Sequence, residues 1–391
     1  MTGATTLPTD REELRTQLLG AVDAISGTLA DCADEAERSG RYPERGWRAL
    51  HDAGLLRVKA PRELGGLEAD PVTQIAVIER LAYIDTTAAW TQFVGAGTLA
   101  IVAAWLTDAG VEDYLVDGRL PRTAGGVAAA GTAVPVQGGY RLTGRWPFAS
   151  GCYHAEWLSG TSYIADRDPV EVLGFAFPAD QVTIHDTWDV SSLKGTGSAD
   201  ISVEDLFVPA EHTFDNFAPA ARGGPLYRIA LPGFVANEHG AFVLGAARRA
   251  LDETAALAKT KTRGYVIPQG VAAREKFQWD LGRADVALRA ARAGLVEANE
   301  QAWQAAVSGA PIDAGMQTGL RGTAVYATEV ALEVVRTMFR YAGAKSLYTG
   351  NLIDRCLRDV QAAAQHGIVN DVSHELHGQT LLGLQDVAPL S

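Results

Sequence analysis

The spacing of apolar positions in the first third of the chain is typical of helices. From about Asp10 to Gly118, apolar side chains recur every three or four residues in a sequence rich in Ala, Leu, Glu and Arg. The stretch from Thr86 to Leu106 is almost entirely apolar or small, which predicts a helix buried on most sides. We therefore predict an N-terminal helical domain over residues 1–119.

The pattern changes to short strands after Leu120. Apolar and β-branched runs of strand length are separated by glycine turns, such as Gly138-Gly139 between VPVQ and YRLTGRW. Later runs of the same kind read LGFAFPA, VTIHDTW and ISVEDLFV. Together they predict a central antiparallel β-domain over residues 120–216.

Long helical patterns return after Leu226. Helical periodicity is found over residues 226–261, 272–307 and 313–342, and a shorter helix follows over RCLRDVQAAAQH, from Arg355 to His366. These four runs predict a C-terminal four-helix bundle over residues 217–391.

Composition and charge narrow the function to small-molecule chemistry. The chain has 391 residues, of which 47% are hydrophobic and 21% charged, as in soluble globular proteins. Its formal net charge of -13 disfavours binding to nucleic acid or to anionic membranes, because both need clustered cations. We expect no export signal and no transmembrane helix. The cysteines Cys32, Cys152 and Cys356 are too widely separated for a disulfide framework or a CxxC motif, so we expect a cytoplasmic protein.

The segment WPFASGCYHAEW, from Trp146 to Trp157, is a candidate ligand site at a turn between strands. Ser150 and Gly151 can present a hydroxyl and a free backbone N–H side by side, while Trp146 and Phe148 supply flat apolar walls. Such a site suits a planar ring with polar edges, such as a flavin. The alternative is a tight turn with its aromatic residues in a β-core.

Two further segments carry weaker signals. In LKGTGSAD, Thr196 and Ser198 offer hydroxyls next to Gly197, but the segment lacks the third glycine and the helix of a dinucleotide fingerprint. In KTKTRG, the cations up to Arg263 end a long helix, where they complement the helix dipole or meet a cofactor phosphate.

The C-terminal histidines do not predict a metal site. His374 and His377 are one residue short of HExxH spacing, and no carboxylate or cysteine is positioned to complete a set with His366. His366 at a helix end is either an ordinary surface histidine or a functional group.

Over nearly its whole length the sequence resembles the acyl-CoA dehydrogenase superfamily, whose fold places helices before and after a central β-domain. The resemblance is carried by GGYRLTGRWPFASG, LKGTGSADISVEDLFVP, LGAARRALDETAALAKTKTRG and RCLRD. Within RCLRD, the resemblance implies a structural role for Arg355, Arg358 and Asp359.

The region around His366 separates the chemistries of this superfamily. Dehydrogenases usually carry a glutamate base eight residues after the aspartate of the Arg-Asp pair, and that position is Gly367, with no glutamate in QHGIVND. Some dehydrogenases keep the base in an earlier helix, and the aligned position looks like Val235, one turn from Glu238. The W-x-F-x-S-G loop and the R-x-x-R-D helix ending in histidine are similar to those of two-component flavin-dependent monooxygenases, the group D type.

This resemblance implies roles for particular residues. Ser150 would hydrogen-bond flavin N5 beside Gly151, with Trp146 and Phe148 framing the ring and Thr196, Gly197 and Ser198 holding its other edge. Arg263 and the Gly343–Ser346 loop, with Lys345 and Ser346, would meet the cofactor phosphates. His366 would face the substrate, and Trp90, Phe93 and Tyr348 are aromatic candidates to stack on it.

The implied reaction is hydroxylation of an aromatic substrate, with an indole-type compound preferred. Reduced flavin, FADH2 or FMNH2, would come from a separate NAD(P)H flavin reductase and react with O2 to a C4a-hydroperoxyflavin. His366 would either accept a proton from the substrate or donate a hydrogen bond to the departing oxygen. A homotetramer is expected. The alternatives are an acyl-CoA dehydrogenase and a non-catalytic flavin-binding or scaffold protein.

Overall fold

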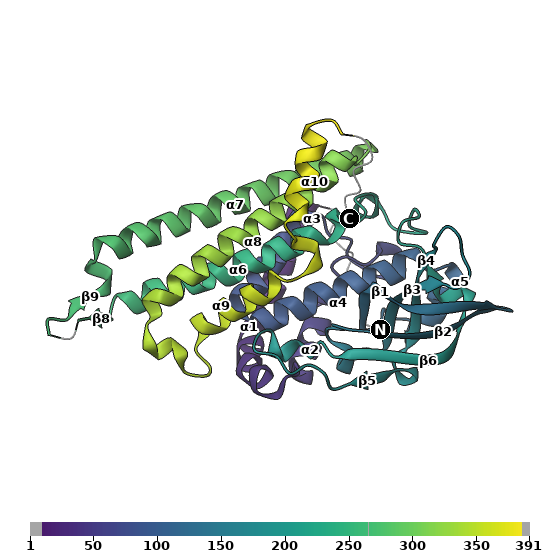
Figure 1. The fold of residues 1–391 in the computed structure, drawn as a ribbon, viewed down its shortest axis with the longest axis horizontal. Coiled ribbons are helices and arrows are strands. Elements are labelled where there is room, and N and C mark those ends of the chain that lie inside the picture. Colours follow the sequence, from purple (N-terminus) through teal and green to yellow (C-terminus); the bar gives the residue numbers. More distant parts are fainter. Residues whose placement is uncertain (1–9, 265, 385–391) are drawn as a thin grey trace. The chain divides into compact units, whose positions relative to one another are not determined.

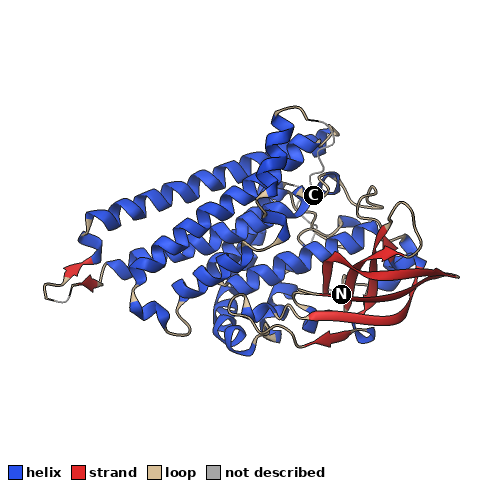
Figure 2. Ribbon diagram, viewed as in Figure 1, coloured by secondary structure: helices blue, strands red, loops and turns tan. Residues whose placement is uncertain are grey.

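The computed structural model describes residues 10–264 and 266–384, and the chain packs there as two compact units (Figures 1 and 2). The first unit contains residues 10–70, 90–190 and 194–228, and the second contains 71–89, 191–193 and the described residues from 229 onward. The division into three domains stays a prediction, and its outer ends at residues 1 and 391 lie outside the described residues.

The first unit begins with helices that the sequence predicted. Helix α1 (Arg11–Ser39) starts where the Asp10 carboxylate accepts the Glu13 N–H at 2.9 Å, and α2 (Glu44–Asp52) follows. Helix α4 (Thr86–Trp105) continues from the second unit into the first, and α5 (Asp108–Tyr114) follows it. By length and composition alone, α4 passes as a membrane span among the described residues, but 83% of its most apolar window is buried. The predicted burial of this helix is confirmed.

A seven-stranded sheet completes the first unit, in the order β5-β6-β2-β1-β3-β4-β7. Its strands are β1 (Thr123–Val136), β2 (Gly139–Trp146), β3 (Trp157–Ile164), β4 (Val172–Pro178), β5 (Thr183–His185), β6 (Asp200–Pro209) and β7 (Thr213–Phe214). The sheet is mixed, because β1 and β3 are parallel, whereas the sequence predicted an antiparallel β-domain. The reason is that residues 147–156 carry the chain from β2 across to the far side of β1, and this crossover contains Ser150.

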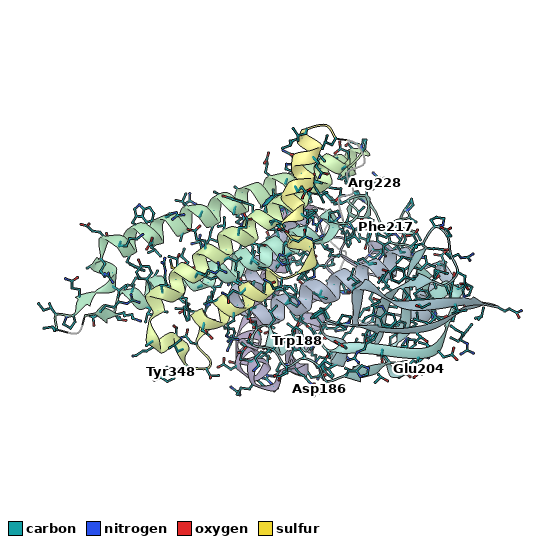
Figure 3. All side chains as sticks on the ribbon, in the orientation of Figure 1. Asp186, Trp188, Glu204, Phe217, Arg228 and Tyr348 are labelled. Atoms are coloured by element: carbon teal, nitrogen blue, oxygen red, sulfur yellow. The ribbon has the colours of Figure 1, made fainter. Side chains whose placement is uncertain are left out.

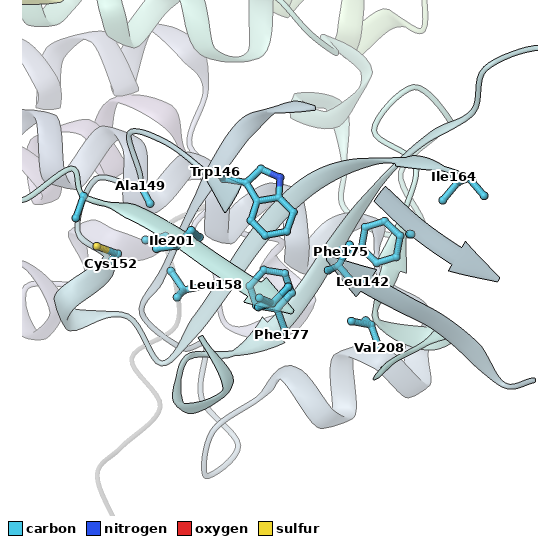
Figure 4. Packing of buried hydrophobic residues seen from close by; sticks show 14 residues of the cluster. Leu142, Trp146, Ala149, Cys152, Leu158, Ile164, Phe175, Phe177, Ile201 and Val208 are labelled. Atoms are coloured by element: carbon cyan, nitrogen blue, oxygen red, sulfur yellow. The ribbon is translucent and has the colours of Figure 1, made fainter. Parts of the chain in front are cut away.

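Trp146 does not frame a ligand, contrary to the prediction. Its indole is fully buried in the β-core with Phe177, and its Nε1 donates a hydrogen bond to the Thr161 carbonyl at 2.7 Å (Figure 4). The ring fits because glycines surround it: a Cβ on any of them would lie within 2.7 Å of the Trp146 side chain. These glycines are Gly126, Gly131, Gly144 and Gly160.

Substituting Gly160 with alanine should therefore destabilise the first unit. The added methyl would overlap the Trp146 ring, and overpacking of this kind costs about 1–3 kcal/mol. The matched control is Gly282→Ala on the exposed face of a helix, where nothing lies within 4 Å and alanine should stabilise by about 0.5–1 kcal/mol. Denaturant unfolding would measure both, and equal stabilities would contradict the packing argument.

The second unit is the predicted helical bundle together with α3 (Pro71–Ile84). Its other helices are α6 (Gly233–Ala258), α7 (Glu275–Ser308), α8 (Ala314–Ala342), α9 (Leu352–Ala363) and α10 (Val372–Leu381), with a hairpin of β8 (Thr262–Arg263) and β9 (Gln269–Gly270) between α6 and α7. Helix α8 packs against α6, α7, α9 and α10. Helix α3 packs closely on α6, where a Cβ on Gly245 would lie 2.5 Å from the Glu79 carbonyl oxygen.

Candidate functional site

A buried chain of polar groups surrounds Ser150 in the first unit. The Ser150 hydroxyl accepts a hydrogen bond from Trp90 Nε1 at 3.2 Å and lies 2.6 Å from the Ser198 hydroxyl. Ser198 in turn lies 2.7 Å from the Thr196 hydroxyl, and all these side chains are buried. The predicted residues Trp90, Ser150, Thr196 and Ser198 are thus brought together from α4 and two loops. Phe93, also predicted, packs edge-on against Trp90 with the ring centroids 5.2 Å apart.

The backbone of the Ser150 loop presents Phe148 outward. Phe148 has a φ of 62° and is 70% exposed, and its ring meets the edge of Trp188 at a centroid distance of 6.2 Å; Figure 3 labels Trp188. A left-handed conformation in a bulky residue costs about 1–3 kcal/mol, and such strain is concentrated at functional sites. Phe148, rather than Trp146, is therefore the exposed aromatic side chain of the Ser150 loop.

The backbone N–H of Gly151 is not free, contrary to the prediction. It donates to the Thr196 carbonyl at 3.1 Å, while the Ala149 N–H donates to the Ala199 carbonyl at 3.1 Å. Both bonds join the Ser150 loop to the segment that carries Thr196 and Ser198. The role of Gly151 is therefore to hold the two loops together.

His154 anchors the far end of the Ser150 loop. Its Nδ1 lies 3.0 Å from a Glu44 carboxylate oxygen and its Nε2 lies 2.7 Å from the Tyr42 carbonyl oxygen. Burial lowers the pKa of His154, although both acceptors oppose that shift by stabilising the imidazolium. The loop is thereby tied to the start of α2.

In the second unit, helix α9 holds the turn at residues 191–193. Asp359 accepts the hydroxyl of Thr86 and the backbone N–H of Leu193, both at 2.6 Å, and Leu193 has a φ of 48°. Arg358 donates to the Ser191 carbonyl. These contacts agree with the structural role implied for Arg358 and Asp359. The turn directly precedes the Lys194–Ser198 segment in the chain.

His366 stands after the end of α9, at the start of a short 3₁₀ helix (Gly367–Val369). Its side chain is exposed, and its Nδ1 accepts the Ile368 N–H at 3.3 Å. His239 on α6 lies against it, with the ring centroids 5.7 Å apart and the planes inclined by 36°. Surrounding protein lowers the pKa of His366 by desolvation.

His239 was not singled out by the sequence. It is fully buried, and its Nε2 donates to the Ala363 carbonyl at 2.9 Å. Burial, followed by the effect of His366, lowers its pKa to about 3. The signal in the sequence is the polar run Asn237-Glu238-His239 within an apolar helix. Glu238, the remaining candidate for a dehydrogenase base, is fully buried on the same helix.

The low pKa of His239 predicts a specific acid lability. Between pH 6.5 and about 3 the unfolded chain binds a proton that the folded chain excludes, so stability falls as the pH is lowered. At pH 5 the loss is about 2 kcal/mol. His239→Gln keeps a donor for Ala363 and should flatten this dependence. Unfolding curves from pH 7 to 4 test the prediction, and parallel curves for wild type and variant would refute it.

A cluster of cations surrounds Gly343 at the end of α8. Lys261 donates to the Ala342 carbonyl and Arg263 donates to the Arg340 carbonyl, so both cations satisfy the end of α8 rather than the end of their own helix α6, which the alternative interpretation had predicted. Burial, then Arg263 and Lys345, lowers the pKa of Lys261. A Cβ on Gly343 would lie 2.7 Å from Lys261 Nζ.

Ser346 was predicted to bind a cofactor phosphate, and Tyr348 was predicted to stack on the substrate. The Ser346 hydroxyl is buried and donates to the Gly343 carbonyl at 2.7 Å, so it is committed within its own turn rather than to a phosphate. Tyr348 is 74% exposed on the loop between α8 and α9 (Figure 3). Its predicted contact with substrate stays a prediction. Within the described ranges, no group of three or more His, Cys, Asp or Glu side chains could hold a metal ion.

Comparisons with known proteins agree with the resemblance. The acyl-CoA dehydrogenase N-terminal domain matches residues 12–117, and the acyl-CoA dehydrogenase C-terminal domain matches residues 238–371. Indole-3-acetate monooxygenase of Pseudomonas putida is 32% identical, with 85% of each chain covered. The flavin-dependent monooxygenase oxygenase subunit HsaA of Rhodococcus jostii is 27% identical over 88% of this chain and 92% of its own.

The fold has a similarly close relative among solved structures. XiaF from Streptomyces sp., in complex with FADH2 and glycerol, superposes with a TM-score of 0.91 at 28% identity, over 97% of this chain and 98% of its own. The chain therefore belongs to the flavin-dependent monooxygenases of the acyl-CoA dehydrogenase fold, as the oxygenase component of a two-component system.

Proposed function

We propose that this monooxygenase hydroxylates an indole-type aromatic substrate with FADH2 supplied by a separate NAD(P)H flavin reductase. The observation that carries the proposal is the Trp90–Ser150–Ser198 hydrogen-bonded chain beside an outward, strained Phe148. Reduced flavin, when bound, would activate O2 and supply one oxygen atom of the O2 to the substrate. The protein must bind and orient both partners and keep water out.

The residues around Ser150 fit the ring of a flavin. The Ser150 hydroxyl would bond N5, and its orientation is supported by the Trp90 N–H donor at 3.2 Å. Phe148 would lie against the ring, since a 70% exposed phenyl in a left-handed backbone otherwise gains little. Thr196 and Ser198 would line the other edge, because the two backbone bonds to the Ser150 loop fix them there.

The cation cluster, which lies within the second unit, suits the phosphates of a flavin. Lys261, Arg263 and Lys345 lie near one another, and the absence of a side chain at Gly343 lets Lys261 Nζ approach its backbone closely. The α8 carbonyls balance part of this charge, and an anion would balance the rest. Of the two predicted phosphate contacts in this loop, Lys345 is therefore favoured, because the Ser346 hydroxyl is already bound to the Gly343 carbonyl.

His366 is proposed to face the substrate. Its side chain is exposed at the start of the 3₁₀ helix, and its position corresponds to the region where dehydrogenases keep their base. The indole preference is supported by the 32% identical relative named indole-3-acetate monooxygenase, and the FADH2 preference by the cofactor bound to XiaF.

The proposal is tested by giving the protein anaerobic FADH2 or FMNH2, then air and indole-3-acetate. We expect a hydroxylated indole product by mass spectrometry and tighter binding of FADH2 than FMNH2 in an anaerobic titration. Turnover of simple phenols alone would overturn the indole preference, and tighter FMNH2 binding would overturn the choice of flavin.

We further propose a cytoplasmic homotetramer assembled through the second unit. The support for assembly is a set of exposed apolar side chains there, namely Val266, Ile267 and Leu347. The support for the cytoplasm is that Cys32, Cys152 and Cys356 are free and buried. Light scattering should give a mass four times the 41.5 kDa of one chain. A mass of one chain would contradict the proposed assembly.

A further inference from the structure

The structure assigns a tautomer to His366. We propose that its neutral ring carries hydrogen on Nε2 and donates a hydrogen bond to an acceptor oxygen of the substrate, instead of acting as a base. The donor role rests on the proposed function, in which His366 faces the substrate. The tautomer does not depend on that function.

The first support is the contact of Nδ1. The backbone N–H of Ile368 points at Nδ1 of His366 at 3.3 Å. A backbone N–H can only donate, so Nδ1 must present its lone pair. The single hydrogen of a neutral imidazole is then on Nε2.

The second support is that this backbone is held rigidly by a buried arginine. Arg321 on α8 donates from Nε to the Ile368 carbonyl at 2.9 Å. Its Nη2 donates to the Gly367 carbonyl and to the Asn370 side-chain oxygen, both at 3.0 Å. These charge-assisted bonds fix residues 367–370, so the Ile368 N–H cannot readily turn away from the His366 ring.

The third support is the surroundings of the ring. His239 lies against His366 at 5.7 Å and is fully buried, with its own Nε2 hydrogen bound to the Ala363 carbonyl. Loss of solvation lowers the pKa of His366, which favours the neutral ring beside this buried neighbour.

The tautomer has a consequence for the substrate. To act as a base, Nε2 would have to be unprotonated, and the hydrogen of the neutral ring would then be on Nδ1. That N–H would point at the Ile368 N–H, which is also a donor, so the hydrogen bond between them would be lost. An Nε2 donor instead requires an acceptor, such as a carboxylate, carbonyl or phenolate oxygen. An indole N–H is itself a donor and cannot fill this position. The indole-type substrate should therefore carry an acceptor oxygen that reaches His366.

The tautomer can be read directly by ¹⁵N NMR of histidine-labelled protein without flavin or substrate. The His366 signals are assigned by their loss in His366→Gln. We expect Nδ1 to resonate as an unprotonated nitrogen and Nε2 as a protonated one at neutral pH. The reverse pattern, or averaged shifts for the two nitrogens, would overturn the assignment. In Arg321→Lys the ¹⁵N shifts of the two His366 nitrogens should move closer together, because the guanidinium that binds residues 367–370 at several points is lost.

The donor role is tested by the yield of product per flavin oxidised. His366→Gln keeps an N–H donor near the position of Nε2 and cannot act as a base, so its yield should stay within about tenfold of wild type. His366→Ala should lose about a hundredfold, the size expected for one catalytic hydrogen-bond donor. If Gln is as defective as Ala, the donor role is overturned. If Ala matches wild type, the substrate-facing position itself is wrong, while the NMR result is unaffected.

Discussion

Replacing Ser150 by alanine should lower the yield of hydroxylated product per flavin oxidised by about a hundredfold or more. Ser150 links Trp90 Nε1 at 3.2 Å to the Ser198 hydroxyl at 2.6 Å, within a largely buried site. Losing one preorganised hydrogen-bonding group at such a site typically costs a factor of about 100–1,000. Trp90 would also lose the acceptor of its indole N–H.

The measurement follows peroxide and product together after mixing of the enzyme with reduced flavin and oxygenated buffer. Peroxide should replace product in Ser150→Ala while flavin is still oxidised. The matched control is Ser162→Ala on strand β3 of the same unit. It removes a buried hydroxyl that has no hydrogen-bond partner among the described residues. The control should keep the wild-type yield. Equal yields from both variants would show that Ser150 is not part of the flavin site.

Replacing Asp359 by alanine should have the largest effect on stability. Asp359 is buried and accepts hydrogen bonds from Thr86 and Leu193, both at 2.6 Å. Removing one partner from a buried charged network costs about 3–5 kcal/mol. Arg355 and Asp85 share this environment, where burial raises the pKa of Asp85 to about 7 and the charge of Arg355 opposes that shift.

The control for Asp359 lies on the same helix. Asp354 binds Arg358 at 2.8 Å as a partly exposed i,i+4 pair, so Asp354→Ala should cost only about 0.3–0.5 kcal/mol. Denaturant unfolding would compare the two. Flavin binding should also weaken in Asp359→Ala, because the turn at Leu193 leads into the Thr196 to Ser198 segment. A stable Asp359→Ala with wild-type flavin affinity would contradict the role given to α9.

The Ser150 loop shows which features of the candidate site can be predicted from neighbouring residues alone. The succession of aromatic, serine and glycine residues located the loop, because turn chemistry is encoded within a few residues. It did not decide between Trp146 and Phe148. That choice depends on Gly126, Gly131 and Gly160, which come from other strands and make room for the Trp146 ring.

The surroundings of His366 could not be predicted from neighbouring residues, because they come from helices far away in the sequence. The absence of a glutamate near Gly367 was visible in the sequence and pointed to the correct family. Its partners His239 and Arg321 lie on α6 and α8, and nothing in the local pattern links them to α9. The parallel pairing of β1 with β3 was missed for the same reason, since a crossover loop and a hairpin loop look alike in sequence.

The central claim is that the enzyme inserts one atom of O2 into an aromatic substrate with reduced flavin. The most direct test mixes the enzyme with FADH2, prepared without air, and indole-3-acetate under ¹⁸O2. The product is then analysed by mass spectrometry. The account predicts one ¹⁸O atom in each product molecule and none when the label is in water. Absence of product, together with anaerobic bleaching of bound FAD by an acyl-CoA thioester, would contradict it.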